Sequence, residues 1–235
     1  MDELEFPGSP GKPDWEGLYL YRGSDVVASR PIFTGDVFFG AEVQGIGAIE
    51  TKDIIVIQHP CALRTNGVDL AVSLMVAEVT PGRLYAGNEW HGNYKLMPLP
   101  EMAGTESHYL ASFTSIYLAI PDSLIAANRV ACLSPTGVNL LMQRWVCHNS
   151  RVVVPAWKYD EVVSAQYEEA DMIEEWCDIR NSSHVSVADA TAEATAWLND
   201  DGGSGVKRRM MLDTPAFRAP MRKALRKQAK ALNQG

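Results

Sequence analysis

The sequence predicts an α+β protein, in which a small β-barrel or sandwich is followed by helices and a basic C-terminal tail helix. Short apolar runs separated by turn residues occupy 17–133, a pattern typical of successive strands. After residue 134 the apolar residues recur at helical spacing instead. The chain has 235 residues, 46% of them hydrophobic, and no run approaches the ~18 uncharged apolar residues of a membrane helix. We therefore expect a folded protein with no membrane partner.

The expected strands are short and bounded by glycine, proline and polar residues. They cover 17–21, 36–43, 53–58, 70–79, 93–99 and 109–120. The run at 53–58 is continuously apolar and 70–79 is the longest β-rich run, so both are predicted to be central strands. Pro98 places 93–99 at an edge or a strand end, because proline cannot donate to a ladder.

A packed helix is expected at 135–149, because Ser134 is a favourable N-cap and Pro135 occupies the preferred first helical position. The side chains expected to be buried along it are Val138, Leu141, Met142 and Trp145. The apolar run at 151–154 is predicted to form a final strand. Further helices are expected at 158–180, which is rich in acidic residues, and at 187–198, where Ser186 is the N-cap.

Composition divides the chain into five expected segments. They are a flexible leader at 1–16, a β-barrel domain at 17–155, an acidic helical extension at 156–199, a linker at 200–205 and a basic tail at 206–235. The linker DDGGSG is assigned from its glycines and polar residues. Two prolines confine the tail helix to about 220–233.

Charge separates the tail from the rest of the chain. From Lys207 onward there are nine basic residues and one acidic residue, a net charge of +8, whereas 1–206 carries 12 basic and 28 acidic residues, a net charge of −16. The apolar stripe of the tail helix is short and consists of Met221, Leu225, Gln228 and Leu232. Such a helix is marginal alone and must dock, either on the acidic helix at 158–180 or on an anionic partner, which is RNA, DNA or an acidic protein.

The tail therefore supplies candidate residues for binding nucleic acid or a partner protein. These are Arg218, Arg222, Lys223, Arg226, Lys227 and Lys230. A second basic group, Arg144, His148 and Arg151, has the spacing i, i+4, i+7 of one helix face. This face either receives a phosphate, for which arginine has suitable donors, or is a solvated edge paired with the acidic helix.

Two short motifs carry nucleophilic or capping residues. Gly35-Asp36 is interpreted as a turn in which Asp36 caps nearby amides. His59 and Cys61 follow the expected strand at 53–58, where an imidazole close to a thiol is one arrangement that activates cysteine. The alternative interpretation is a turn histidine followed by a small, buried cysteine.

The four cysteines, Cys61, Cys132, Cys147 and Cys177, lack the paired spacing of a zinc site and are read as reduced thiols. The chain has no Gly-rich phosphate loop, no G-x-S-x-G and no HExxH. We expect no metal and no cofactor. The acidic N-terminal stretch lacks an apolar signal region, so a cytoplasmic location is expected.

The order of the strand motifs resembles that of the PemK/MazF-like toxins over about 32–146. The segments that carry the resemblance are FTGDVFF, KDIIVIQHP, VAEVTPG, GNYKLMPL, ASFTSIYLAI and RVACLSPTGVNLLMQRW. The resemblance implies an SH3-like β-barrel with a packed helix, RNA cleavage without metal and a homodimer. It assigns cleavage to Thr80 and to the position of Lys52, where the family has an Arg-Pro pair. Lysine supplies positive charge but not the planar donor fork of arginine.

Three functions follow as hypotheses. The first is a nucleic-acid-associated barrel protein of toxin or phage-defence type, with the ribonuclease activity retained or lost. The second is a non-enzymatic interaction module that docks a partner protein through its barrel and basic tail. The third is a thiol enzyme that uses Cys61.

Overall fold

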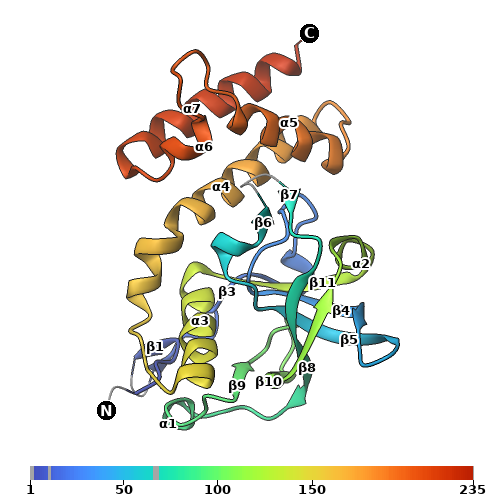
Figure 1. Cartoon of the computed structure of the whole chain (residues 1–235), viewed down its shortest axis with the longest axis vertical. Coiled ribbons are helices and arrows are strands. Elements are labelled where there is room, and N and C mark those ends of the chain that lie inside the picture. The colour runs from blue at the N-terminus through green and yellow to red at the C-terminus, as the bar shows by residue number, and fades with distance from the viewer. Residues whose placement is uncertain (1–2, 10–11, 66–68, 235) are drawn as a thin grey trace. The chain divides into compact units, whose positions relative to one another are not determined.

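The computed structural model describes residues 3–9, 12–65 and 69–234 and shows a mixed α+β protein (Figure 1). The chain forms two compact units. The first comprises the chain up to Val26 together with Phe33–Glu161, and the second comprises Val27–Ile32 and Val162–Gly235. The expected barrel domain thus corresponds to most of the first unit, whereas the expected extension from Val162 onward, the linker and the tail belong to a single second unit.

A seven-stranded antiparallel sheet dominates the first unit. Its strands are β3 (Tyr19–Arg22), β4 (Asp36–Gln44), β5 (Ile49–Val56), β8 (Leu74–Gly82), β9 (Leu96–Leu99), β10 (His108–Ala119) and β11 (Asn128–Leu133). Their order is β3-β11-β4-β5-β8-β10-β9. Leu118 of β10 also pairs with Gln44 of β4, so the pairings join β4, β5, β8 and β10 in a ring.

The central strands are those that the apolar runs predicted. β5 and β8 lie in the middle of the sheet, and Ile54, Ile55 and Val76 are fully buried. β9 is an edge strand, as Pro98 indicated. The strand β11 was not expected; it pairs with β3 and β4 and contains the buried Cys132.

Short elements connect the strands of the first unit. They are β1 (Gly8–Ser9), β2 (Lys12–Pro13), η1 (Gly23–Asp25), η2 (Pro60–Ala62), β6 (Arg64–Thr65), β7 (Asp69–Leu70), α1 (Gly87–Trp90) and α2 (Pro121–Ala126). The Gly35-Asp36 turn before β4 behaves as expected, because the buried Asp36 carboxylate accepts a hydrogen bond from the Phe33 amide (2.9 Å). Gly35 has a φ of 86°, and a Cβ there would lie 2.8 Å from the Leu133 side chain.

Helix α3 (Pro135–Ser150) contacts β11 and β9. The Ser134 hydroxyl accepts from the Gly137 amide (3.1 Å), which confirms the expected N-cap. The helix ends at Arg151, whose φ of 61° is left-handed. The final strand predicted at 151–154 is wrong: this segment has no strand pairing, and the Val154 carbonyl accepts from the side chain of Gln143.

The described part of the expected leader is packed against the first unit. Leu4 is buried, and the Glu5 amide donates to Gln143 (2.7 Å). The Glu5 carboxylate accepts from Gln143 (2.9 Å) and from the Ala156 amide (2.8 Å). These contacts satisfy buried polar groups and distinguish the segment from the loose leader that its prolines suggested.

The second unit is helical. Its helices are α4 (Trp157–Asn181), which begins in the first unit, α5 (Val187–Asn199), α6 (Arg208–Met211) and α7 (Pro215–Leu232). The buried core that they share consists of Met172, Ile173, Trp176, Cys177, Ala190, Ala194, Leu198, Leu212, Leu225 and Ala229. The Ser186 hydroxyl accepts from the Asp189 amide (3.1 Å), which confirms the cap of α5.

Helix α7 differs from the expected tail helix in two respects. It begins at Pro215, and Pro220 lies inside it, where the missing amide proton removes one intrahelical hydrogen bond. Leu225 and Ala229 are buried and Met221 is partly buried beside them, whereas Gln228 is exposed and Leu232 is 42% exposed. A small residue, Ala229, therefore occupies a position of α7 that packs into the core.

The expected linker is a turn inside the second unit. Gly202, Gly203 and Gly205 have positive φ values of 58°, 86° and 77°, which allow the chain to reverse. The carboxylate of Asp200 accepts from Arg208 (2.7 Å) across this turn. Within the described part of the chain, the helices are too short or too polar to cross a bilayer.

Candidate nucleic-acid interface

Lys52 and Thr80, to which the family resemblance assigned cleavage, lie on the neighbouring strands β5 and β8. Ile54 pairs with Glu78, so alternation along the two strands places Lys52, Glu78 and Thr80 on one face. Thr80 is exposed and Lys52 is partly exposed. The structure therefore brings the two residues to one surface.

Two carboxylates neutralise the charge of Lys52. Its Nζ lies 3.3 Å from Glu50 Oε2 and 3.2 Å from Glu78 Oε1, and it stands 5.6 Å from the ring centroid of Tyr117. The hydrogen bonds to Glu78 and Glu50 raise the pKa of Lys52. One ammonium between two carboxylates carries a net charge of −1, which repels phosphate. This surface is poorly suited to holding a scissile phosphate.

His59 and Cys61 form a local turn. The Cys61 amide donates to His59 Nδ1 (3.2 Å), so this ring nitrogen caps the main chain of η2. Burial lowers the pKa of His59, which favours its neutral form. A neutral imidazole lacks the positive charge that would stabilise a thiolate. Cys61 is exposed, so the alternative interpretation of the sequence, which expected a small, buried cysteine here, is wrong on this point.

Arg144 does not contribute to a phosphate-binding face. Its side chain is fully buried, and NH2 donates to the carbonyls of Glu5 (2.7 Å) and Trp90 (3.1 Å). The guanidinium lies 4.7 Å from the Trp90 ring centroid. Burial lowers the pKa of Arg144 to about 9. The expected basic face is wrong at this position, because this side of α3 is covered by the N-terminal segment.

His148 and Arg151 remain at the surface beside aromatic rings. We call Tyr94, Phe113, Trp145, His148 and Arg151 the ring cluster. His148 lies parallel to Trp145 at 9° and 6.0 Å, and the Arg151 guanidinium lies 4.2 Å from the centroid of Tyr94. Tyr94 and Phe113 were not among the predicted residues; the pair Tyr94-Lys95, an aromatic residue next to a cation, was the available signal.

The tail arginines face the acidic helix. Arg222 pairs with Glu168 (2.7 Å), and Arg226 pairs with Glu175. Arg218 donates to the Ser164 hydroxyl (2.9 Å). Successive positions of α7 thus contact successive positions of α4, which run in the same direction. Of the two docking alternatives, the structure contains the internal one, in which α7 docks on α4.

The tail lysines lie on the opposite side of α7. Lys223, Lys227 and Lys230 are exposed and have the spacing i, i+4, i+7, whereas Leu225 and Ala229 on the other side are buried. We call these three residues the lysine face. Arginine suits bidentate pairing with carboxylates, while lysine behaves as a hydrated point charge. In α7, therefore, Arg222 and Arg226 form internal ion pairs, whereas the lysines are exposed to solvent.

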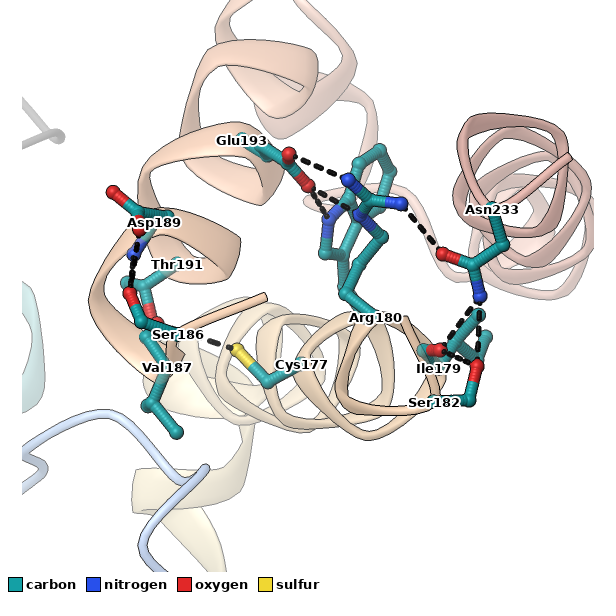
Figure 2. A network of polar contacts seen from close by, with 11 residues as sticks. Cys177, Ile179, Arg180, Ser182, Ser186, Val187, Asp189, Thr191, Glu193 and Asn233 are labelled. Carbon is teal, nitrogen blue, oxygen red and sulfur yellow. Dashed lines mark hydrogen bonds and ion pairs between the residues drawn. The ribbon is translucent and has the colours of Figure 1, made fainter. Parts of the chain in front are cut away.

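A polar network that the sequence did not reveal fixes the end of α7 (Figure 2). Arg180 of α4 donates to both carboxylate oxygens of Glu193 in α5 (2.7 and 2.9 Å) and to Asn233 (2.5 Å). The Asn233 amide donates to the Ile179 carbonyl (2.8 Å). Hydrogen bonds from Arg180 lower the pKa of Glu193. This network joins three helices and holds the lysine face in place.

Among the described residues, no group of three or more His, Cys, Asp or Glu side chains is arranged to hold a metal ion. Comparison of the chain with models of known protein families gives no match, and comparison with curated proteins gives none either.

Proposed function

We propose that this protein binds nucleic acid without cleaving it, as a non-catalytic relative of the PemK/MazF-like toxins with an SH3-like barrel. The observation that carries the proposal is the segregation of the tail cations. Internal pairing uses the arginines, and Lys223, Lys227 and Lys230 form one exposed stripe. Such a stripe can follow a phosphate backbone, whose contacts dominate nucleic-acid affinity.

Two further observations support parts of this proposal. The ring of pairings through β4, β5, β8 and β10 is compatible with a small closed barrel. The carboxylates of Glu50 and Glu78 around Lys52 disfavour phosphate binding at the surface that the family resemblance assigns to cleavage. Retention of the barrel with loss of cleavage accounts for both.

The test is binding of the full-length protein to fluorescein-labelled 20-nucleotide RNA and DNA, followed by anisotropy at several salt concentrations. Replacing Lys223, Lys227 and Lys230 with glutamine should weaken binding. It should also lower the slope of log affinity against log salt by about 2, since each phosphate contact on a single strand contributes about 0.7.

The matched control replaces Lys12, Lys158 and Lys207, which are also exposed, with glutamine. It changes the net charge equally but leaves the lysine face intact. If the two triple variants lose affinity equally, the loss comes from the change in net charge and not from the lysine face, which would contradict the proposal. Absence of binding by the natural protein at low salt would also contradict it.

A protein-interaction module is the second candidate, and an exposed apolar patch favours it. Ile49 and Leu118 both pair with Gln44 and so lie on one face, and Ile46, Ile120 and Ile125 are further exposed apolar residues of the first unit. Contiguous exposed apolar surface is characteristic of protein contacts. Competition with polyglutamate distinguishes the two candidates. If polyglutamate displaces labelled RNA from the protein as effectively as unlabelled RNA of equal charge does, an acidic protein groove becomes the better ligand for the lysine face. The thiol-enzyme hypothesis gains no support from the neutral, main-chain-bonded His59.

A further inference from the structure

The ring cluster contains several partly exposed aromatic groups around one buried ring, Phe113. Phe113 is buried and lies 5.5 Å from Trp145 and 5.9 Å from His148, centroid to centroid. Tyr94 lies 6.4 Å from His148. Tyr94, Trp145 and His148 are each only partly buried. The rings therefore retain surface against which a planar group can stack.

An irregularity in β10 builds this arrangement. The register of β10 against β8 shifts between Ser112 and Ile116, and Phe113 lies in the interrupted stretch. The Phe113 amide donates to the Lys95 carbonyl (3.0 Å), which brings the segment that carries Tyr94 alongside. Bulges of this kind redirect side chains and are common next to functional sites.

The charge around the rings is positive. Arg151 is exposed over Tyr94, and the neighbouring Lys95 is exposed as well. Burial, followed by the positive charges of Arg151 and Lys95, lowers the pKa of His148. This differs from the Lys52 surface, where a cation over a tyrosine is neutralised by two carboxylates. The ring cluster therefore attracts phosphate, whereas the Lys52 surface repels it.

We propose that the ring cluster binds an unpaired base of a single-stranded nucleic acid, with Arg151 and Lys95 contacting the adjacent phosphates. The base stacks on the neutral rings, and the flanking cations follow the backbone, as in sequence-tolerant single-strand binding. Bases inside a duplex are already stacked and cannot reach the rings. This inference rests on the proposed nucleic-acid binding and specifies the strand class.

The experiment measures affinity of the full-length protein for labelled oligo(U), oligo(dT) and a mixed-sequence duplex of the same length. The natural protein should prefer the single strands. Replacing His148 with alanine and Arg151 with glutamine together should weaken single-strand binding about tenfold, because one stacked base contributes about that factor. Duplex binding should change less than about twofold.

Arg83→Gln is the matched control, because Arg83 also lies over a tyrosine, Tyr85 (4.4 Å), but is paired with Glu89. It should leave binding unchanged. Arg151→Gly separates binding from folding. Glycine suits the φ of 61° at this helix end, so this variant should lose single-strand affinity without a lower melting temperature.

The outcomes separate this inference from the proposed function. Equal affinity for single strands and duplex, unaffected by the ring-cluster variants but lost in the lysine-face variant, overturns the inference and leaves the proposed function standing. Absence of binding to every oligonucleotide overturns both. A single-strand preference that is lost in both His148/Arg151 variants supports the inference, and the oligo(U) and oligo(dT) arms show whether the sugar matters.

Discussion

The two units of this protein accommodate buried arginine in different ways. In the first unit, Arg144 is buried against the Trp90 ring and two main-chain carbonyls. In the second, Arg30 contacts Asp171 (3.0 Å) and Glu174 (2.8 Å), and Arg180 contacts Glu193. The first arrangement depends on packing and the second on charge pairing. Changes in packing and changes in charge should therefore affect the two units differently.

The difference follows from what each unit has to bury. The sheet of the first unit provides an apolar interior, in which Ile54, Ile55 and Val76 are fully buried. The helices of the second unit bury a smaller core and carry opposite charges on α4 and α7. Exposed ion pairs contribute only about 0–1 kcal/mol each, so apolar contacts remain necessary in both units.

The largest expected effect is in the first unit. Trp90→Ala should lower the free energy of unfolding by about 3–5 kcal/mol, because Trp90 is fully buried between Trp15 and Arg144. Urea unfolding monitored by circular dichroism measures it. Trp157→Ala, at a side chain that is 58% exposed, is the control and should cost far less. Equal losses would contradict the role given to Trp90.

The next effect tests whether α7 is packed or merely attracted by charge. Leu225→Ala should cost about 2–5 kcal/mol, because Leu225 is fully buried in the helical core. Amide hydrogen exchange should show faster exchange in α7. Leu232→Ala changes the same residue type at a half-exposed position and should have little effect. Unchanged protection in Leu225→Ala would show that ion pairs alone hold the helix.

The substitution Glu193→Gln tests how much the polar network around Arg180 stabilises the second unit. Glu193→Gln should cost about 1–3 kcal/mol at neutral pH, because charge-assisted hydrogen bonds to Arg180 weaken. Arg180 lowers the pKa of Glu193 below its ordinary value of 4.5 in the folded protein. The stabilisation is therefore complete above pH 4.5 and is lost as the pH falls through the lower folded value.

The measurement is urea unfolding of the natural protein and of Glu193→Gln between pH 3 and pH 7. The difference between them should shrink toward the acidic end. Glu161→Gln, at an exposed residue, is the control and should show a small and nearly constant difference. A difference for Glu193→Gln that does not depend on pH would exclude the ionised pair as its cause.

The smallest effect is expected from salt. At 1 M salt the Debye length is about 3 Å, so the pairs Arg222–Glu168 and Arg226–Glu175 should weaken as their charges are screened. Exchange protection in α7 should fall, whereas protection in β5 and β8 should not. Protection that falls equally in α7 and in the central strands would remove the distinction between the two units.

The sequence predicted the local elements well where the signal is local. The cap residues Ser134 and Ser186 correctly marked helix starts, because capping depends on neighbouring amides. The central strands at 53–58 and 70–79 were identified from apolar runs. The unpaired segment at 151–154 was misassigned, because strand formation also requires a partner that β propensity cannot supply.

The candidate site was predicted less well. The basic tail residues were identified, but their division into inward arginines and an outward lysine face depends on which stripe of α7 is buried. The face expected from Arg144, His148 and Arg151 was only partly correct, because Arg144 is covered by the N-terminal segment. Phe113 entered the ring cluster through a register shift in β10, which no pattern in the sequence marked.

By itself, the sequence determined the α+β class, the positions of the central strands and of the capped helices, and the contrast between an acidic body and a basic tail. These properties follow from periodicity, capping and charge, which act between residues close in the chain. Only the tertiary structure decided which cations are neutralised, which remain exposed and which rings meet. Those outcomes depend on contacts between residues far apart in the chain, such as Glu5 with Arg144 and Glu168 with Arg222.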